Sequence, residues 1–307
     1  MYYNKEYLKS WFKITRFQFY PMTWLAYTVG SLSSFKIIDD FNLIVYIFGY
    51  ISLFLIEFAT VISNEYYDYE TDRINENYSQ FTGGSRMLVE GKISFKQAKR
   101  AIFVSLVLVF IISTILTLTY NIYTIFIMLV GIFLGLAYTV PPFKLSYRGL
   151  GELDVGVTHS FYILLAGFLL QSPKLDITIP ILLSIPLFFA IFGAIILGGF
   201  PDYEADKKTG KKTITVILGQ RKASIISITS ILLSIISGGF ILFSSIVGFG
   251  GIIYLAVIIH GLILLYLLAA GVMDNVIHNR VDKILQTSLS YIMWFTIIPL
   301  LYLLNIF

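Results

Sequence analysis

The chain contains no cysteine, which excludes disulfide bonds, thiolate metal ligands and cysteine nucleophiles. Charged residues are also scarce, at 13% of the chain, whereas a soluble protein carries roughly 25%. The three histidines follow no spacing that is typical of a metal site. We expect no nucleic-acid partner, because the formal charge of +4 matters less than where the charges lie.

Hydrophobic residues make up 57% of the chain and aromatic residues 16%. Several apolar runs approach the ~20 residues that are needed to cross a bilayer. They predict nine transmembrane helices, at about 16–36, 41–63, 101–120, 122–141, 153–172, 178–200, 223–243, 247–270 and 286–305. The sequence therefore predicts an all-α integral membrane protein that forms a single polytopic domain over residues 1–307.

The connections between these runs alternate in charge. Of the 22 lysines and arginines, all but Lys36 and Lys174 fall on one side of the predicted membrane. Basic loops stay in the cytoplasm, so the N-terminus and the loops after the even-numbered runs are predicted to be cytoplasmic. An odd number of spans then places the C-terminus outside the cell membrane.

Polar residues recur every fourth position where the second apolar run ends. Asn64, Asp68 and Asp72 fall on one face of a helix that turns ~100° per residue, and Glu57 extends this face into the membrane. A divalent cation such as Mg²⁺ would relieve the repulsion among these oxygens, since it is commonly shared between carboxylates and substrate phosphates. Alternatively, the acids form a solvated helix end that pairs with Arg73 or nearby lysines.

The same spacing recurs after the sixth run. Asp202 and Asp206 are followed by Lys207, Lys208, Lys211 and Lys212. The two copies lie four spans apart, which predicts two pseudo-related four-helix halves around a central cavity. Two facing acidic walls could hold two Mg²⁺ ions around a diphosphate, with the lysines on its remaining oxygens. The lysines could equally form an ordinary cytoplasmic loop.

These motifs carry a family resemblance. N-x-x-x-D-x-x-x-D at 64–72, D-x-x-x-D at 202–206 and G-K-x-T at 210–213 resemble the UbiA-type superfamily of intramembrane prenyltransferases. The stretches TGGSRMLVEGKIS, YTVPPFKLSYRGLGE and PDYEADKKTGKKT are most similar to the branch that prenylates 1,4-dihydroxy-2-naphthoate in menaquinone synthesis. The chain departs from the family in having Gly198-Gly199 before the second motif, and Tyr138 and Lys144 six residues apart in place of Tyr-x-x-x-Lys.

The resemblance implies Mg²⁺-dependent transfer of a polyprenyl group from an allylic diphosphate to an aromatic acceptor, with the prenyl tail in a tunnel open to membrane lipid. It implies catalytic, metal-binding aspartates at Asp68, Asp72, Asp202 and Asp206, with Asn64 as a further metal ligand. The diphosphate is expected to contact Arg73, Arg86, Lys144, Lys208 and Lys212. Further candidates are Glu57, Arg16 and Tyr138.

Three of these candidates also have simpler interpretations. Glu57 is expensive to bury in a membrane and is a functional candidate for that reason, but it could equally be a neutral, hydrogen-bonded helix contact. Gly83-Gly84-Ser85-Arg86 could form a backbone nest for a diphosphate, or a plain turn in a long loop. Arg16 could reach the cavity or anchor the membrane interface.

Other functions remain open. Prenyl transfer to a glycerol phosphate lipid, or cyclisation of the prenyl chain, would use the same scaffold. A cation-coupled transporter is less favoured, because its polar groups usually cluster near the bilayer midplane. Here they lie at one membrane face.

Overall fold

The computed structural model describes residues 5–172, 176–243, 252–273 and 281–304. All regular secondary structure within these ranges is helical. The longer helices are α1 (Lys5–Ile14), α2 (Tyr20–Ile38), α3 (Leu43–Tyr67), α5 (Phe95–Thr119), α6 (Thr124–Ala137), α9 (Thr178–Gly198), α12 (Gln220–Phe243), α13 (Ile252–Met273) and α14 (Asp282–Leu303). Between α6 and α9, α7 (Gly151–Val157), a π-helical turn (Thr158–Tyr162) and α8 (Ile163–Gln171) follow one another without a break.

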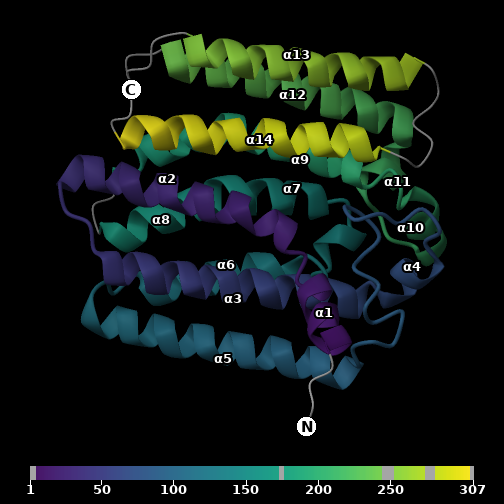
Figure 1. Cartoon of the computed structure of the whole chain (residues 1–307), viewed down its shortest axis with the longest axis horizontal. Coiled ribbons are helices and arrows are strands. Elements are labelled where there is room, and N and C mark those ends of the chain that lie inside the picture. The colour runs from purple at the N-terminus through teal and green to yellow at the C-terminus, as the bar shows by residue number, and fades with distance from the viewer. Residues whose placement is uncertain (1–4, 173–175, 244–251, 274–280, 305–307) are drawn as a thin grey trace.

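The long helices lie side by side in a layered bundle (Figure 1). α12 and α13 form one outer layer, α9 and α14 pack beneath them, α2 and α8 follow, and α3 and α5 lie on the other side. The short helices α4 (Tyr69–Ile74), α10 (Tyr203–Thr209) and α11 (Ile214–Leu218) gather at one end of the bundle. Both acidic motifs therefore lie at the same end.

Six helical segments are long and apolar enough to cross a membrane: Leu43–Tyr67, Phe95–Thr119, Gly151–Gln171, Thr178–Gly198, Gln220–Ile241 and Asp282–Leu303. They agree with the prediction of an all-α integral membrane protein. The predicted number of nine spans is not confirmed. α6 and the Leu255–Gly271 part of α13 are apolar but shorter. α2 covers the first predicted run, but its serines, threonines and tyrosines make it less apolar.

Local sequence sets where the helices near the motifs begin and bend. Ser94 caps α5 in a reciprocal arrangement with Gln97, so the long loop after the first motif ends at a defined residue. The π-helical turn at Thr158–Tyr162 widens one turn of the span that faces α9.

Glycines allow α2 and α8 to approach closely. A Cβ atom on Gly30 would clash with the backbone carbonyl of Leu164, and one on Gly167 would clash with the carbonyl of Tyr27. Small residues at helix crossings are a common solution in membranes, where packing rather than the hydrophobic effect holds helices together.

We predict that Gly30→Ala destabilises the protein, although alanine is intrinsically a better helix former than glycine by ~1 kcal/mol. The added methyl group meets backbone atoms that cannot move aside, so the free energy of unfolding should fall by ~1–3 kcal/mol. Gly198→Ala is the matched control, because a Cβ there meets nothing within 4 Å. Thermal unfolding in detergent measures both, and equal stability of the two variants would contradict the close contact.

Candidate functional site

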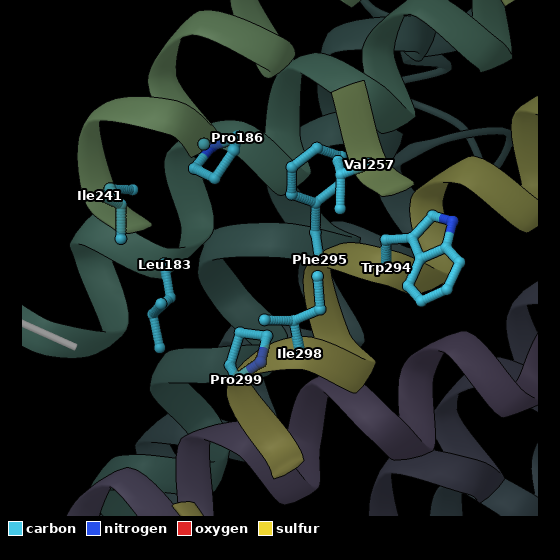
Figure 2. A pocket seen from close by; sticks show the side chains of 9 residues that line it. Leu183, Pro186, Ile241, Val257, Trp294, Phe295, Ile298 and Pro299 are labelled. Carbon is cyan, nitrogen blue, oxygen red and sulfur yellow. The ribbon is translucent and has the colours of Figure 1, made fainter. Parts of the chain in front are cut away.

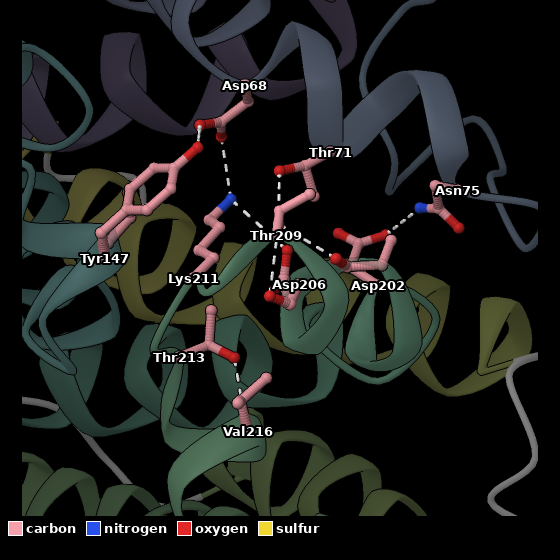
Figure 3. Close-up of polar contacts among 12 residues, drawn as sticks. Asp68, Thr71, Asn75, Tyr147, Asp202, Asp206, Thr209, Lys211, Thr213 and Val216 are labelled. Carbon is pink, nitrogen blue, oxygen red and sulfur yellow. Dashed lines mark hydrogen bonds and ion pairs between the residues drawn. The ribbon is translucent and has the colours of Figure 1, made fainter.

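The two acidic motifs meet through their short helices. α4 and α10 pack against each other, and the hydroxyl groups of Thr71 and Thr209 lie 2.9 Å apart (Figure 3). α3 ends at Tyr67 and α4 begins at Tyr69. Helical hydrogen bonding nevertheless continues across this break, because the N–H of Asp72 donates to the carbonyl of Asp68 at 2.8 Å. The first motif is thus a bent rather than a straight helix. The second motif begins just after α9, with Asp202 at the start of α10.

A lysine lies between the motifs. The Lys211 ammonium donates to Asp68 Oδ2 at 2.8 Å and lies 3.8 Å from Asp206 Oδ1. The Lys211 residue is only 8% exposed. The other oxygen of Asp68 accepts a hydrogen bond from the Tyr147 hydroxyl at 2.9 Å (Figure 3). Three parts of the chain that are far apart in sequence therefore converge on Asp68.

Asp202 has a different partner. The Asn75 side-chain amide donates to Asp202 Oδ1 at 2.7 Å, while the Asn75 carbonyl oxygen Oδ1 accepts from the backbone of Asn77. Asn75 follows the end of α4, so this bond is a second connection between the motifs. Asp202 and Asp68 are therefore held by separate donors rather than by a shared one.

The loop after α4 folds back onto the acids. Gly83 and Gly84 have φ angles of 74° and 69°, which glycine adopts without strain. The backbone N–H and the hydroxyl of Ser85 both donate to the buried carboxylate of Glu65. The N–H of Ser85 that a phosphate nest would offer is therefore already used by Glu65.

Two arginines fix this loop. The Arg86 guanidinium donates to the backbone carbonyl of Asp72 at 2.8 Å and lies over the ring of Tyr78, 4.1 Å from its centroid. Arg16 donates to the carbonyl of Phe81 at 2.6 Å. Arg16 and Arg86, two of the three predicted arginines, therefore lie close to the acidic site and hold the loop.

Burial raises the pKa values of three aspartates at this site. It raises the pKa of Asp72 well above its usual range, and the neighbouring carboxylates of Glu65 and Asp68 add to this effect. Burial also raises the pKa of Asp202, and it raises the pKa of Asp206 to about 7. These groups would ionise more easily beside an additional positive charge.

Two opposing effects set the pKa of Lys211. Burial by itself would lower the pKa of its ammonium group, but the carboxylates of Asp68 and Asp206 hold that pKa well above its usual value. Lys211 is therefore a firmly charged cation among buried acids.

The donor atoms fit a hard divalent cation. The buried oxygens Asn64 Oδ1 and Asp206 Oδ1 have no hydrogen-bond partner, and carboxylate and amide oxygens are what Mg²⁺ prefers. Within the described residues, no three histidine, cysteine or acidic side chains already surround a metal position. Asp68 and Asp202 are instead hydrogen-bonded to protein donors, Lys211 and Asn75.

The other predicted residues are less central. Arg73 pairs with Glu70 at 2.7 Å on an exposed face, and Lys208 and Lys212 are exposed. The Lys144 ammonium lies 3.8 Å from the ring centroid of Tyr147. Lys144 therefore reaches the edge of the site through this ring.

Two further candidates lie deeper. The buried hydroxyl of Tyr138 interacts electrostatically with Lys211 and Glu152. Glu57 lies within the membrane-spanning part of α3, near Tyr20 and Tyr50. The structure brings Tyr138 to the site and leaves Glu57 two helical turns before Asn64.

Three residues of the site were not predicted: Glu65, Asn75 and Tyr147. Glu65 had a usable signal, because it lies seven residues before Asp72 and therefore on the same helix face. Lys211 was predicted together with three neighbouring lysines to contact the diphosphate, and it is the lysine of the G-K-x-T motif, but its burial between the two acidic motifs was not predicted. Asn75 and Tyr147 belong to loops that reach the acids only through the fold.

A small apolar cavity lies elsewhere in the bundle, between α9, α12, α13 and α14 (Figure 2). Its volume of about 20 Å³ is space for roughly one water molecule. Pro186 lines this cavity. It lies ~18 Å along α9 from the C-terminal end of that helix, after which the second acidic motif begins. This cavity is too small to hold a prenyl chain and is separate from the acids.

We predict that Gly84→Ala disturbs the site more than Gly91→Ala. Both glycines have φ near +67°, at 69° and 66°, so both variants carry a similar backbone strain. A Cβ on Gly84 would clash with the Asp72 carboxylate, whereas a Cβ on Gly91 meets nothing within 4 Å. Gly84→Ala should therefore lose a further ~1–3 kcal/mol of unfolding free energy in thermal unfolding. Similar losses in the two variants would argue against the packing of this loop on Asp72.

Comparison with known proteins gives relatives of two activities. The 1,4-dihydroxy-2-naphthoate octaprenyltransferase of Bacillus subtilis (strain 168) is 26% identical over 182 residues, which cover 59% of this chain and 57% of that protein. The digeranylgeranylglyceryl phosphate synthase of Saccharolobus solfataricus is 34% identical over 186 residues, 60% of each chain. The chain thus spans less than two-thirds of the length of these curated relatives.

Solved structures share the fold. A UbiA homologue from Aeropyrum pernix K1, without ligand, superposes with a TM-score of 0.67 at 17% identity, covering 94% of this chain and 96% of that one. A UbiA homologue from Archaeoglobus fulgidus bound to GPP and Mg²⁺ gives a TM-score of 0.59 at 16% identity, covering 96% and 99%. The sequence profile of the UbiA prenyltransferase family matches residues 20–303, nearly the whole of the helical bundle, and the chain therefore belongs to this family.

Proposed function

We propose that the protein transfers a polyprenyl group from an allylic diphosphate to an aromatic acceptor within the membrane, in a reaction that requires Mg²⁺. The observation that carries this proposal is the meeting of the two aspartate motifs around Lys211 at one end of an apolar bundle. Buried acids together with one buried cation match a polyanionic group that arrives with its own metal ions. A structural ion pair alone would not need so many acids.

The chain's own residues would divide the work. The carboxylates of Asp68, Asp72, Asp202 and Asp206 and the amide oxygen of Asn64 would hold Mg²⁺. When bound, the metal supplies positive charge that stabilises the departing pyrophosphate. The Lys211 ammonium and the hydroxyl groups of Tyr138 and Tyr147 lie where they can donate to oxygens of the leaving group. Such preorganised donors act most strongly where charge develops.

The bundle would protect the reaction. As the bond between the prenyl carbon and the diphosphate oxygen breaks, that carbon becomes positively charged and would react with water. The apolar spans exclude water, and aromatic rings such as Phe17, Tyr20 and Phe54, which contact one another between α2 and α3, offer π faces to a cation. The acceptor ring then forms the new carbon–carbon bond and loses a proton.

An aromatic acceptor is proposed because the three quoted segments around the site resemble the naphthoate-prenylating branch. The second candidate is a glycerol phosphate lipid, which the 34% identity to the S. solfataricus enzyme favours. Cyclisation of the prenyl chain is a third outcome that the same experiment detects.

We propose that the motif-bearing end faces the cytoplasm of the cell. The basic residues of the loops at this end support that orientation by the positive-inside rule.

A product assay tests the function. The purified full-length chain in lipid nanodiscs is incubated with Mg²⁺, geranylgeranyl diphosphate and, separately, 1,4-dihydroxy-2-naphthoate, 4-hydroxybenzoate, geranylgeranylglyceryl phosphate or no acceptor, and products are identified by mass. A prenylated naphthoate that disappears with EDTA supports the proposal. A prenylated glycerol phosphate lipid, or a cyclised hydrocarbon without acceptor, would replace it.

We predict that Asp68→Asn, Asp72→Asn and Asp206→Asn each lower kcat by ~10²–10³, because each removes a negative charge that the metal requires. The exposed Glu76→Gln is the control and should keep most of its activity, since surface charges contribute only ~0–1 kcal/mol. The assay measures kcat at several Mg²⁺ concentrations. Near-normal rates in all four variants would indicate that these buried aspartates are structural partners of Lys211 and do not bind a metal.

A further inference from the structure

Lys211 reaches the acids because of a sharp turn after α10. Gly210 has a φ angle of 75°, and the chain reverses there so that the backbone N–H of Lys211 donates to the carbonyl of Asp206 at 2.9 Å. The side chain then points back between the two motifs (Figure 3). The neighbouring Lys208 and Lys212 stay exposed. The turn therefore selects one lysine of the segment for burial.

Both oxygens of Asp68 are already used. One accepts from the Lys211 ammonium at 2.8 Å and the other from the Tyr147 hydroxyl at 2.9 Å. Asp206 differs, since its Oδ1 is buried, has no hydrogen-bond partner and lies 3.8 Å from the same ammonium. A second cation that binds Asp68 and Asp206 together would have to take the position that the Lys211 ammonium now occupies.

Two cations in contact with the same carboxylates repel each other strongly at low effective dielectric. Lysine can yield, because its ammonium is a point charge at the end of a flexible four-carbon stem. Loss of the ammonium without replacement would leave buried carboxylates uncompensated, which is strongly destabilising. The site therefore needs a cation at this position at all times, supplied by the chain or by the metal.

We propose that Lys211 is the internal counter-ion of the site, which compensates Asp68 and Asp206 in the metal-free protein and is exchanged for Mg²⁺ when the diphosphate binds. The released ammonium then contacts the diphosphate. The inference deepens the proposed function and rests on it. It assigns Lys211 two positions, one for each state of the site, and makes it a positioning residue for the metal as well as a contact for the substrate.

The test measures Mn²⁺ affinity by electron paramagnetic resonance, with Mn²⁺ as the probe, in the wild type, Lys211→Met and Lys211→Gln. Removal of the competing charge should tighten Mn²⁺ binding about tenfold or more in both variants, while affinity for inorganic pyrophosphate in the presence of Mg²⁺ should weaken. Lys222→Met, which removes an exposed lysine at the same end of the bundle, should match the wild type.

Thermal unfolding gives an independent measurement. With EDTA, the Lys211 variants should melt at a lower temperature than the wild type, and Mg²⁺ should restore most of the difference, because the metal replaces the missing charge. Lys211→Gln keeps a hydrogen-bond donor for Asp68, so it serves if Lys211→Met does not fold.

The outcomes separate the two proposals. If Mn²⁺ binds the wild type and both Lys211 variants with equal affinity, or binds the variants more weakly, the counter-ion exchange is wrong while the metal-dependent function stands. If none of the proteins binds Mn²⁺, either alone or in the presence of inorganic pyrophosphate, the proposed function and the exchange fail together.

Discussion

The arrangement of this site depends on the ion pair between Lys211 and Asp68. The pair joins the loop after α10 to the end of α3, and Asp206 lies on the other side of the same ammonium. Buried carboxylates repel one another and lose hydration, so a site that contains several of them is stable only when a cation lies among them. Separate hydrogen bonds from Asn75 to Asp202 and from Ser85 to Glu65 replace part of the lost hydration of these two acids.

The loop after α4 adapts its backbone to these acids. Gly84 adopts a positive φ and leaves no side chain where the Asp72 carboxylate lies. The Arg86 guanidinium connects the loop to the carbonyl of Asp72 in α4, and the Arg16 guanidinium donates to the loop carbonyl of Phe81. The loop thus encloses the first motif on the side away from the membrane, and this enclosure explains why burial raises the pKa of Asp72.

The helical bundle places the acidic site at one of its ends (Figure 1). Close helix packing at Gly30 and Gly167 fixes α2 against α8, and the apolar spans leave the acids at one end of a structure that is otherwise apolar. A substrate with a charged head and a long apolar tail matches this division.

The sequence by itself determined the helical class, the membrane character and the sharing of one end by both aspartate motifs. Apolar runs of spanning length form helices because no water is available to the backbone in lipid, and the repeated four-residue spacing needs no tertiary information to place Asp68 and Asp72 on one helix face. Only the tertiary structure decided which lysine is buried, because Lys207, Lys208, Lys211 and Lys212 are chemically equivalent in the sequence and differ only after Gly210 turns the chain. It likewise placed Arg73 on an exposed face and brought Asn75 and Tyr147 to the acids. Contacts between residues so far apart in the chain arise from helix packing, which local spacing does not encode.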